Sequence, residues 1–456
     1  MHTQNARLWF ASALLPQGWV DDVRVIVTEG GIERIESSVV PGARDERHAI
    51  AVPGMPNLHS HAFQRAMAGL AETRDATGSS FWTWRDLMYR FVDTLSADDI
   101  EAIAAYAYVE MLESGFTRVG EFHYLHHAPD GAPYSDPAEL CARIAAAASD
   151  AGIALTLLPV FYAHSGFGGA AAKHEQRRFI HDIDGFARLM EGARRVATSL
   201  PDGRVGVAPH SLRAVTPAEL DAVAGLTANG PIHIHIAEQT GEVEDCIAWC
   251  GRRPVEWLLD HADVDARWCL VHATHLSSEE AARLASSDAV AGLCPVTEAN
   301  LGDGLFPAES FMRAGGRFGI GSDSNVLIDA AAELRLLEYG QRLQHRARSV
   351  LALETGQSTG RRLFEAACSG GAQALDGGAP GITESAPADI VSLHAAHPSL
   401  IERRGDALLD SWIFAGGSGL VDCVWRHGRK LVEGGRHHAR SRIADRYART
   451  LRQRLS

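Results

Sequence analysis

The sequence predicts an α/β protein, a (β/α)₈ TIM barrel with a small β-sandwich domain formed from both chain termini. Between about residues 51 and 354, short apolar runs rich in β-branched residues alternate with amphipathic segments rich in Ala, Leu, Glu and Arg. The alternation occurs eight times, and eight strands that alternate with helices are typical of a TIM barrel. Both ends of the chain instead carry short strands separated by turn residues, which indicates a β domain.

The eight barrel strands are expected where the apolar runs lie. The runs span residues 51–59, 117–124, 154–162, 204–211, 231–238, 268–275, 289–296 and 317–324. Helical patterns fill the intervals between them. Ser96 is a good N-cap for a helix over 97–114, and Pro217 suits the first turn of a helix over 216–228. We therefore expect helices to cover the outside of the barrel.

The small β domain is expected to combine the two ends of the chain. Its candidate strands lie at 6–11, 22–28, 31–36, 388–393 and 422–431. We assign residues 1–53 and 377–456 to this composite domain and residues 54–376 to the barrel.

Composition excludes several classes of protein. With 456 residues, of which 46% are hydrophobic, the chain can bury a substantial core. A net charge of −14 without a basic stretch argues against a nucleic-acid partner and favours a small-molecule substrate. Neither a signal-peptide pattern nor a run of about 18 apolar residues occurs, so we expect a cytoplasmic protein without a membrane partner. The seven scattered cysteines suit reduced thiols, and Cys246 and Cys250 are interpreted as helix packing positions.

The pair His59 and His61 is the first sign of chemistry. It ends the first apolar run, in the sequence Gly-Met-Pro-Asn-Leu-His-Ser-His. Side chains two residues apart on a strand point to the same face, so the two imidazoles can converge on one metal ion. Because a chain with 22 histidines also offers surface pairs, the other strand ends must decide.

Five of the eight predicted strands end in residues that bind metals or transfer protons, at the end of the barrel where active sites lie. These ends are 59–61, 210–213, 233–238, 272–275 and 322–324. Three histidines and one aspartate suit a catalytic divalent metal that keeps room for a water. We predict His59, His61, His235 and Asp323 as the ligands, with Zn²⁺ favoured and Fe²⁺ also compatible.

Several of these motifs resemble the amidohydrolase superfamily, over essentially the full chain. In chain order they are His59-x-His61, His235-x-x-Glu238, His272 and Asp323. Many members hold two metal ions bridged by a carboxylated lysine near strand four. The two lysines of this chain, Lys173 and Lys430, are not placed for that bridge, so a single metal ion is expected. The pattern is most similar to the deaminase branch, in which the carbon of a C=N bond is attacked and ammonia leaves.

The resemblance also implies roles for the acidic and basic groups. A divalent metal lowers the pKa of its bound water to roughly 7, which supplies hydroxide at neutral pH. Asp323 and His272 would take the proton and orient the nucleophile, and Glu238 would protonate the leaving nitrogen. The alternative for Glu238 is an ordinary acid at a helix N-terminus.

Five residues near the predicted metal site suggest the substrate. They are Gln64, Arg85, Tyr124, His210 and Arg213. Two arginines favour a substrate with two carboxylates, because the guanidinium fork matches a carboxylate bidentately.

The segments 59–69, 81–85, 120–127 and 294–304 are similar to the formimidoylglutamate deiminase family, which converts N-formimino-L-glutamate and water to N-formyl-L-glutamate and ammonia in histidine degradation. This resemblance implies that the five residues contact the substrate and that the protein is a homodimer.

Other readings remain open from the sequence. A deaminase of guanine or another heterocycle would use the same metal chemistry, a hydrolase could release formamide from the same substrate, and a binding protein could keep the barrel without catalysis. Glu121 is expected to hydrogen-bond a ligand histidine, and the segment 71–86 to close over the substrate. His123, His126, His127, His164 and His275 are expected around the site or in loops.

Overall fold

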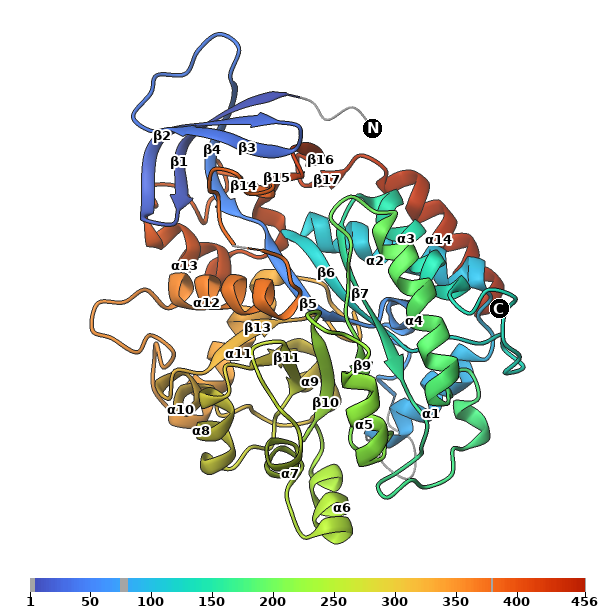
Figure 1. Cartoon of the computed structure of the whole chain (residues 1–456). Coiled ribbons are helices and arrows are strands. Elements are labelled where there is room, and N and C mark those ends of the chain that lie inside the picture. Colours follow the sequence, from blue (N-terminus) through green and yellow to red (C-terminus); the bar gives the residue numbers. More distant parts are fainter. Residues whose placement is uncertain (1–4, 74–80, 379, 456) are drawn as a thin grey trace.

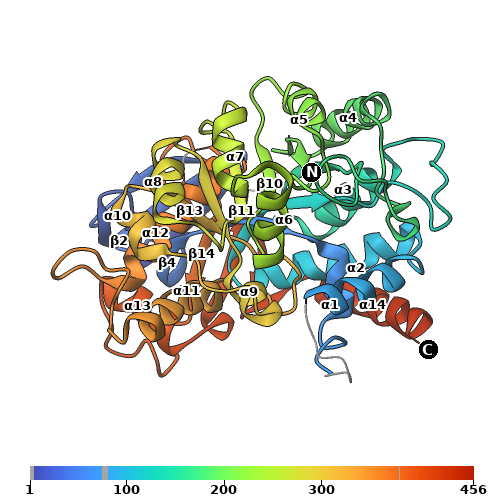
Figure 2. The same ribbon diagram turned by 90° about the horizontal axis from the view of Figure 1, so that it is seen from below.

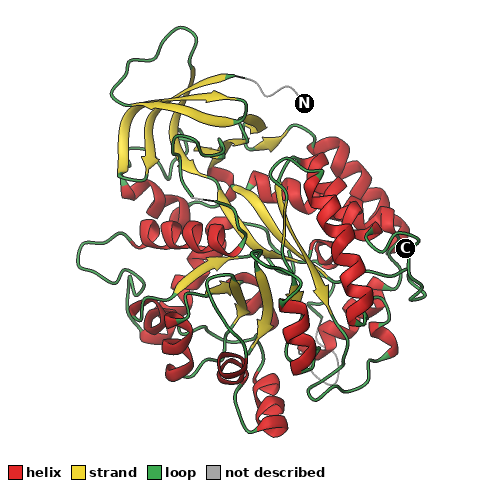
Figure 3. Cartoon of the chain, viewed as in Figure 1, coloured by secondary structure: helices red, strands yellow, loops and turns green. Residues whose placement is uncertain are grey.

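The computed structural model describes residues 5–73, 81–378 and 380–455. Parallel strands run through the larger part of the molecule with helices around them, and a separate sheet occupies one end (Figure 1, Figure 3). The segment 71–86, which we expected to close over the substrate, is covered only in part, since residues 74–80 and the side chains of residues 81 and 82 lie outside the description.

The parallel strands form two sheets. One contains β5 (Met55–Ser60), β6 (Phe116–His123), β7 (Ala154–Phe161) and β8 (Arg204–Val205), with β9 (Ala208–Pro209) also paired to β7. The other has the order β10 (Ile232–Ile236), β11 (Trp268–His272), β12 (Val290–Leu293) and β13 (Arg317–Ile320). The neighbouring strands in both sheets are parallel, so the predicted α/β class is confirmed.

Main-chain hydrogen bonds connect the two sheets at both junctions. At one junction the His61 N–H donates to the Asp323 carbonyl (2.9 Å) and the Asp323 N–H donates to the His59 carbonyl (3.0 Å). At the other, the His235 N–H donates to the His210 carbonyl (2.9 Å). The strand ends that carry the expected site residues are therefore held together by the backbone itself.

Several observed strands are shorter than the apolar runs that predicted them or are divided. The strands expected over 231–238, 268–275 and 317–324 end at Ile236, His272 and Ile320. The run 51–59 divides at Gly54 into β4 (Glu46–Pro53), which belongs to the terminal sheet, and β5. The run 204–211 divides at Gly206, where a Cβ would lie only 2.3 Å from the Pro231 carbonyl oxygen. The run 289–296 ends early because Pro295 begins a helix.

Helices lie at the periphery of the strands when the molecule is turned (Figure 2). In chain order they are α1 (Phe81–Val92), α2 (Ala97–Glu113), α3 (Glu139–Ala151), α4 (Ile183–Thr198), α5 (Pro217–Ala224), α6 (Thr240–Cys250), α7 (Pro254–His261), α8 (Ser278–Ser286), α9 (Pro295–Leu301), α10 (Ala308–Arg313), α11 (Ala330–His345) and α12 (Thr359–Ala374). Short 3-10 helices occur at η1 (Ala62–Met67), η2 (His174–Gln176) and η3 (Ser418–Leu420).

The predicted helix signals act as expected. The Ser96 side chain accepts the Asp99 N–H at the start of α2, and the Asp99 carboxylate accepts the Ser96 N–H in return. Pro217 lies in the first turn of α5, which ends at Ala224, earlier than expected. Cys246 and Cys250 lie one turn apart on α6 with their sulfurs 4.0 Å apart.

Strands from both ends of the chain share one sheet. Its order is β17 (Arg436–His437), β16 (Arg429–Glu433), β15 (Val421–Arg426), β14 (Ile390–Leu393), β4, β1 (Ala6–Leu15), β2 (Gly18–Thr28) and β3 (Gly31–Glu36). The expected sandwich of two sheets is not confirmed. Instead the strands form a single sheet that curls, so that β3 at its edge meets the segment just before β14. There the Ile32 N–H donates to the Ala386 carbonyl (2.9 Å).

The C-terminal segment extends beyond this sheet. After α13 (Asp406–Ala415) and the last strands, α14 (Arg440–Arg454) lies along α2 (Figure 1). Tyr447 of α14 stacks on Tyr106 of α2 with ring centroids 4.2 Å apart, and Arg446 pairs with Glu101 at 2.6 Å. The fifteen residues of α14 were assigned to the β domain, but this helix packs against α2, a helix of the parallel α/β region.

No helix in the described part of the chain combines the length and the apolar character needed to cross a membrane.

Candidate metal centre and active site

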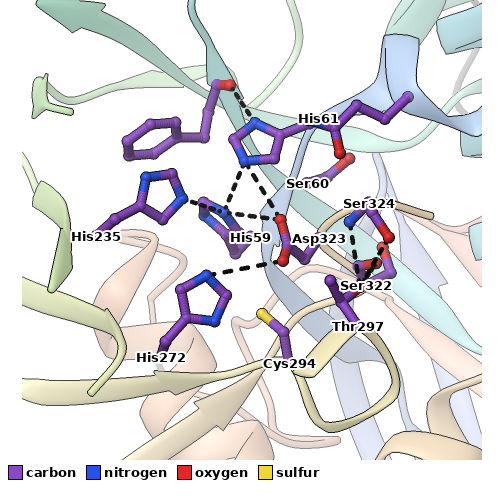
Figure 4. A network of polar contacts seen from close by, with 12 residues as sticks. His59, Ser60, His61, His235, His272, Cys294, Thr297, Ser322, Asp323 and Ser324 are labelled. Atoms are coloured by element: carbon purple, nitrogen blue, oxygen red, sulfur yellow. Dashed lines mark hydrogen bonds and ion pairs between the residues drawn. The ribbon is translucent and has the colours of Figure 1, made fainter. Parts of the chain in front are cut away.

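The four predicted metal ligands converge at one point (Figure 4). His59 Nε2 lies 3.2 Å from His61 Nε2 and 3.0 Å from His235 Nε2. Asp323 Oδ1 lies 3.4 Å from His59 Nε2 and 3.3 Å from His61 Nε2. The four side chains come from β5, β10 and the residues that follow β5 and β13, so strand ends far apart in the sequence build one cluster.

This geometry fits a divalent metal ion. Four ligand atoms placed tetrahedrally about 2.0–2.1 Å from zinc would lie about 3.3 Å from one another, and four of the six separations in the cluster are 3.0–3.4 Å. Burial lowers the pKa of His59 to about 3 and also lowers the pKa values of His61 and His235, so the imidazoles are neutral and offer lone pairs. Burial alone would raise the pKa of Asp323, but contact with His59 outweighs it and lowers the pKa.

The main chain around the cluster is strained. Asp323 has φ 45° and His272 has φ 67°, a left-handed conformation that residues other than glycine rarely adopt. Such conformations collect at functional sites, where the surrounding structure holds them. Gly321 allows the close approach behind the cluster, because a Cβ there would lie 2.7 Å from the His59 carbonyl oxygen.

His272 lies among three carboxylates next to the cluster. Its Nε2 is 3.7 Å from Asp323 Oδ2 and 3.8 Å from Glu238 Oε1, and its Nδ1 is 3.3 Å from Glu298 Oε1. Burial opposes protonation, but Glu238, Glu298 and Asp323 together raise the pKa of His272 to about 10. The three carboxylates therefore favour the protonated imidazolium form of His272, and Glu298 holds the ring on its far side.

Glu238 can exchange a proton near neutral pH. Burial raises the pKa of its carboxyl to about 7. Its backbone N–H donates to Glu242 (3.1 Å), which fixes the turn after β10. A carboxylic acid with this pKa is suited to general acid catalysis.

The five predicted substrate residues line the cavity that also contains His61, His235, Glu238, His272 and Asp323. They are Gln64, Arg85, Tyr124, His210 and Arg213. Gln64 Nε2 donates to the Tyr124 hydroxyl (2.8 Å), which leaves the buried Gln64 Oε1 without a partner in the described structure. The predicted metal ligands His61, His235 and Asp323 and the predicted substrate residues therefore line one cavity.

Sequence reasoning missed several lining residues. They are Trp84, Met88, Tyr89, Phe179, Tyr162, Thr297, Leu301 and Ser324. Two signals were available: Tyr162 ends the third predicted strand, and Tyr89 lies one helical turn after Arg85. Glu298 was also missed as a partner of His272, although its segment carried part of the family resemblance.

The surroundings of the ligands differ from what we expected. We expected Glu121 to hydrogen-bond a ligand histidine, but its Oε1 accepts the Ala62 N–H instead (2.7 Å). His61 is instead oriented by the Phe122 carbonyl, which accepts from its Nδ1 (3.0 Å) and leaves Nε2 toward the cluster.

The other expected histidines have partners of their own. His126, His127 and His275 donate to backbone carbonyls, and His164 pairs with Glu219 at 2.9 Å. His123 is buried in β6 and does not line the cavity. These residues support the loops around the site.

A buried polar network lies behind the ligands. Asn325 Nδ2 donates to Ser60 Oγ (3.1 Å), the His61 carbonyl (3.1 Å) and the Asp323 carbonyl (3.0 Å). Ser322 Oγ donates to Asn325 Oδ1 (2.6 Å). One fully buried amide therefore ties the end of β5 to the end of β13 at the positions that place His61 and Asp323.

Removing this amide should destabilise the fold. We expect Asn325→Ala to lower the free energy of unfolding by about 2–4 kcal/mol, because it leaves several buried polar groups unpaired. Equilibrium unfolding in urea measures the change. The control is Asn300→Ala, since exposed Asn300 makes a surface hydrogen bond to Glu72 and its loss should change stability little. Equal stability of the two variants would show that the network does not hold the strands together.

The parallel α/β fold and the histidine and aspartate cluster at its strand ends define a metal-dependent hydrolase of the amidohydrolase type. The model of the amidohydrolase family matches residues 50–431, and the model described as "Formimidoylglutamate deiminase HutF, N-terminal domain" matches residues 8–49. The chain is 50% identical over 441 residues to the formimidoylglutamate deiminase of Pseudomonas aeruginosa, covering 96% of this chain and 97% of that protein. The chain belongs to the amidohydrolase family and, within it, to the formimidoylglutamate deiminases.

Solved structures agree with this placement. An amidohydrolase from Brucella melitensis superposes with a TM-score of 0.96 at 56% identity and covers 99% of this chain and 100% of its own. An adenosine deaminase from Xanthomonas campestris, solved with bound zinc, superposes with a TM-score of 0.80 at 20% identity, covering 99% of this chain and 98% of its own. The second likeness shows the shared fold.

Proposed function

We propose that this protein hydrolyses N-formimino-L-glutamate to N-formyl-L-glutamate and ammonia in histidine degradation. The observation that carries the proposal is one cavity that combines the metal-binding cluster with cationic side chains. The histidine and aspartate cluster and Glu238 contribute to this cavity, and Arg85 and Arg213 line it as well. A small amidine with two carboxylates matches both sets of residues. The 50% identity to the Pseudomonas aeruginosa formimidoylglutamate deiminase supports the same substrate.

We also propose that a single divalent ion, with Zn²⁺ favoured over Fe²⁺, is held by His59, His61, His235 and Asp323. A bound ion of this kind lowers the pKa of its water and supplies hydroxide at neutral pH. A second group, His272 with Cys294 and Glu298, is a poorer candidate. Burial raises the pKa of the Cys294 thiol, which keeps it protonated, and His272 is protonated as well.

The remaining site residues suit the chemistry of deimination. Asp323 would accept the proton from the attacking water, His272 would orient the nucleophile, and Glu238 would give a proton to the nitrogen that leaves. Gln64 Oε1, buried without a partner in the described structure, would accept an N–H of the formimino group. Tyr124 would support Gln64, with which it already forms a hydrogen bond.

The cationic residues of the cavity would bind the carboxylates of the substrate. Arg85 and Arg213 both act electrostatically on His210, and burial together with these two cations lowers the pKa of His210 well below its usual value. A neutral His210 can donate one hydrogen bond without adding charge. Arg85 and Arg213 would then supply the charge that binds the two carboxylates.

The proposed reaction is tested by ammonia release and product identification. The wild-type protein should release ammonia from N-formimino-L-glutamate and form the N-formyl product, with little turnover of guanine or cytosine. Release of formamide would indicate that a different C–N bond is cleaved. Turnover of the heterocycles without turnover of the acyclic substrate would favour the alternative of a heterocycle deaminase, which the aromatic residues Trp84 and Phe179 of the cavity would suit.

The two parallel sheets are inferred to form one closed (β/α)₈ barrel. The support is the pair of parallel bridges at their junctions, Ser60 with Asp323 and Val207 with Ile232. The family match over residues 50–431 agrees with this architecture.

A homodimer without a nucleic-acid partner is proposed for the assembled protein. Exposed apolar side chains gather at and near α11, where a second copy could cover them: Leu305, Leu327, Tyr339 and Leu343 are 50%, 51%, 37% and 80% exposed. Light scattering distinguishes a dimer from a monomer. The cytoplasm is proposed as the location, because the seven cysteines are free thiols and six of them are buried.

A further inference from the structure

We infer that Tyr89 and Tyr162, oriented by Gln176, bind a carboxylate of the substrate and help to select an acidic acyclic amidine. The inference rests on the proposed function and adds specificity residues to the same cavity. Both tyrosines line the cavity with Arg85 and Arg213, and both are more than nine-tenths buried. Neither was expected from the sequence.

The orientation of the Gln176 amide is fixed by the backbone. Gln176 ends η2 and is 2% exposed. Its Oε1 accepts the Lys173 N–H (2.8 Å), and a backbone N–H can only donate. The amide nitrogen must therefore face the opposite way, where it lies 2.7 Å from the Tyr162 hydroxyl and 3.4 Å from the Tyr89 hydroxyl.

This arrangement directs phenol protons away from Gln176. Each hydroxyl oxygen accepts from the amide, so the protons of Tyr89 and Tyr162 must be donated elsewhere. The two hydroxyls are also close enough to interact with each other. That contact can use one of the two protons at most, and at least one O–H therefore remains to donate to a group in the cavity.

The position of the pair matches a carboxylate. Tyr89 lies on α1 one turn after Arg85, whose guanidinium carbon is 5.8 Å from the Tyr89 ring centroid. Tyr162 follows β7, and Arg213 and Arg85 both act electrostatically on it. Burial nevertheless raises the pKa of Tyr162, so the phenol stays protonated and remains a donor. Two cations and a neutral O–H donor form a suitable set for an anionic oxygen.

The acids that line the cavity lie at its metal-binding part. Among the described residues that line the cavity, Glu238 and Asp323 are the acids. Both are within 4 Å of His272. Arg213 also interacts electrostatically with Glu242 and Glu238, and the phenol O–H groups would add hydrogen bonds to a carboxylate of the substrate.

The test compares Tyr89→Phe, Tyr162→Phe and Gln176→Glu with the wild type on three substrates. These are N-formimino-L-glutamate, its analogue without the α-carboxylate (4-formimidoylaminobutyrate), and its analogue without the side-chain carboxylate (N-formimino-L-2-aminobutyrate). Gln176→Glu keeps the acceptor for Lys173 but turns the donor into an acceptor, which should draw the phenol protons out of the cavity. Tyr339→Phe, at an exposed position on α11, is the matched control.

We expect each site variant to lose about 10–100-fold in kcat/KM on the diacid, mainly through KM, as the loss of a hydrogen bond to a charged group would give. One of the two analogues, the one without the recognised carboxylate, should show little difference between variant and wild type. Equal losses on all three substrates, or no loss on the diacid, would overturn the inference. A wild-type protein that releases no ammonia would instead refute the proposed function, and an unchanged thermal midpoint shows that each variant folds.

Discussion

Replacing Asp323 by Asn should reduce turnover by roughly a thousand-fold or more. The carboxylate is the anionic member of the proposed ligand set and the proposed acceptor of the proton from the attacking water, and such a proton acceptor contributes about 10²–10⁴-fold. His272→Asn should lose a similar factor, because the imidazole that lies 3.7 Å from Asp323 Oδ2 can no longer orient the attacking water. Measurement of kcat on N-formimino-L-glutamate checks both changes.

Metal analysis separates the two variants. The wild type and His272→Asn should each retain about one ion per chain, whereas Asp323→Asn should retain less, since an amide is a weaker ligand than a carboxylate. Asp98→Asn is the control, because the Asp98 side chain is 77% exposed on α2 and does not line the cavity. Activity within tenfold of the wild type in either site variant would contradict the assigned roles, provided that thermal unfolding shows a folded protein.

The ligand cluster was predictable because it follows from strand geometry. His59 and His61 share a face by the two-residue period, and His235 and Asp323 end other strands at the same end of the sheets. The sheet to which each part of the run 51–59 belongs was harder to predict. The run 51–59 is mostly apolar and continuous, yet β4 pairs with β14 and β1 while β5 pairs with β6. Local alternation does not record this change of partner at Gly54.

Residues that act through other residues could not be predicted from the sequence. Gln176 lies in a loop helix between β7 and α4, where no periodicity marks it, and its importance appears only when Tyr89 and Tyr162 are brought to it. Asn325 likewise acts through contacts with Ser60 and His61, more than 260 positions away in the chain. Such long-range hydrogen bonds depend on packing that local patterns do not encode.

Replacing Glu238 by Gln should lower kcat by about 10²–10⁴-fold, the usual contribution of a general acid. The amide keeps the shape of the side chain but cannot deliver a proton to the nitrogen that leaves. KM should change little, because Arg85 and Arg213 are the residues proposed to bind the carboxylates. Glu279→Gln, at an exposed position on α8, should leave kcat unchanged.

The pH profile gives the sharper test of the same residue. Burial raises the pKa of Glu238 to about 7, so the protonated form that can act as an acid predominates below that pH and is lost as the pH rises above it. Wild-type kcat should therefore fall on the alkaline side of about pH 7, and the small residual kcat of Glu238→Gln should lack that fall. If the variant kept the same alkaline limb, the limb would belong to another group, and Glu238 would not be the acid that releases ammonia.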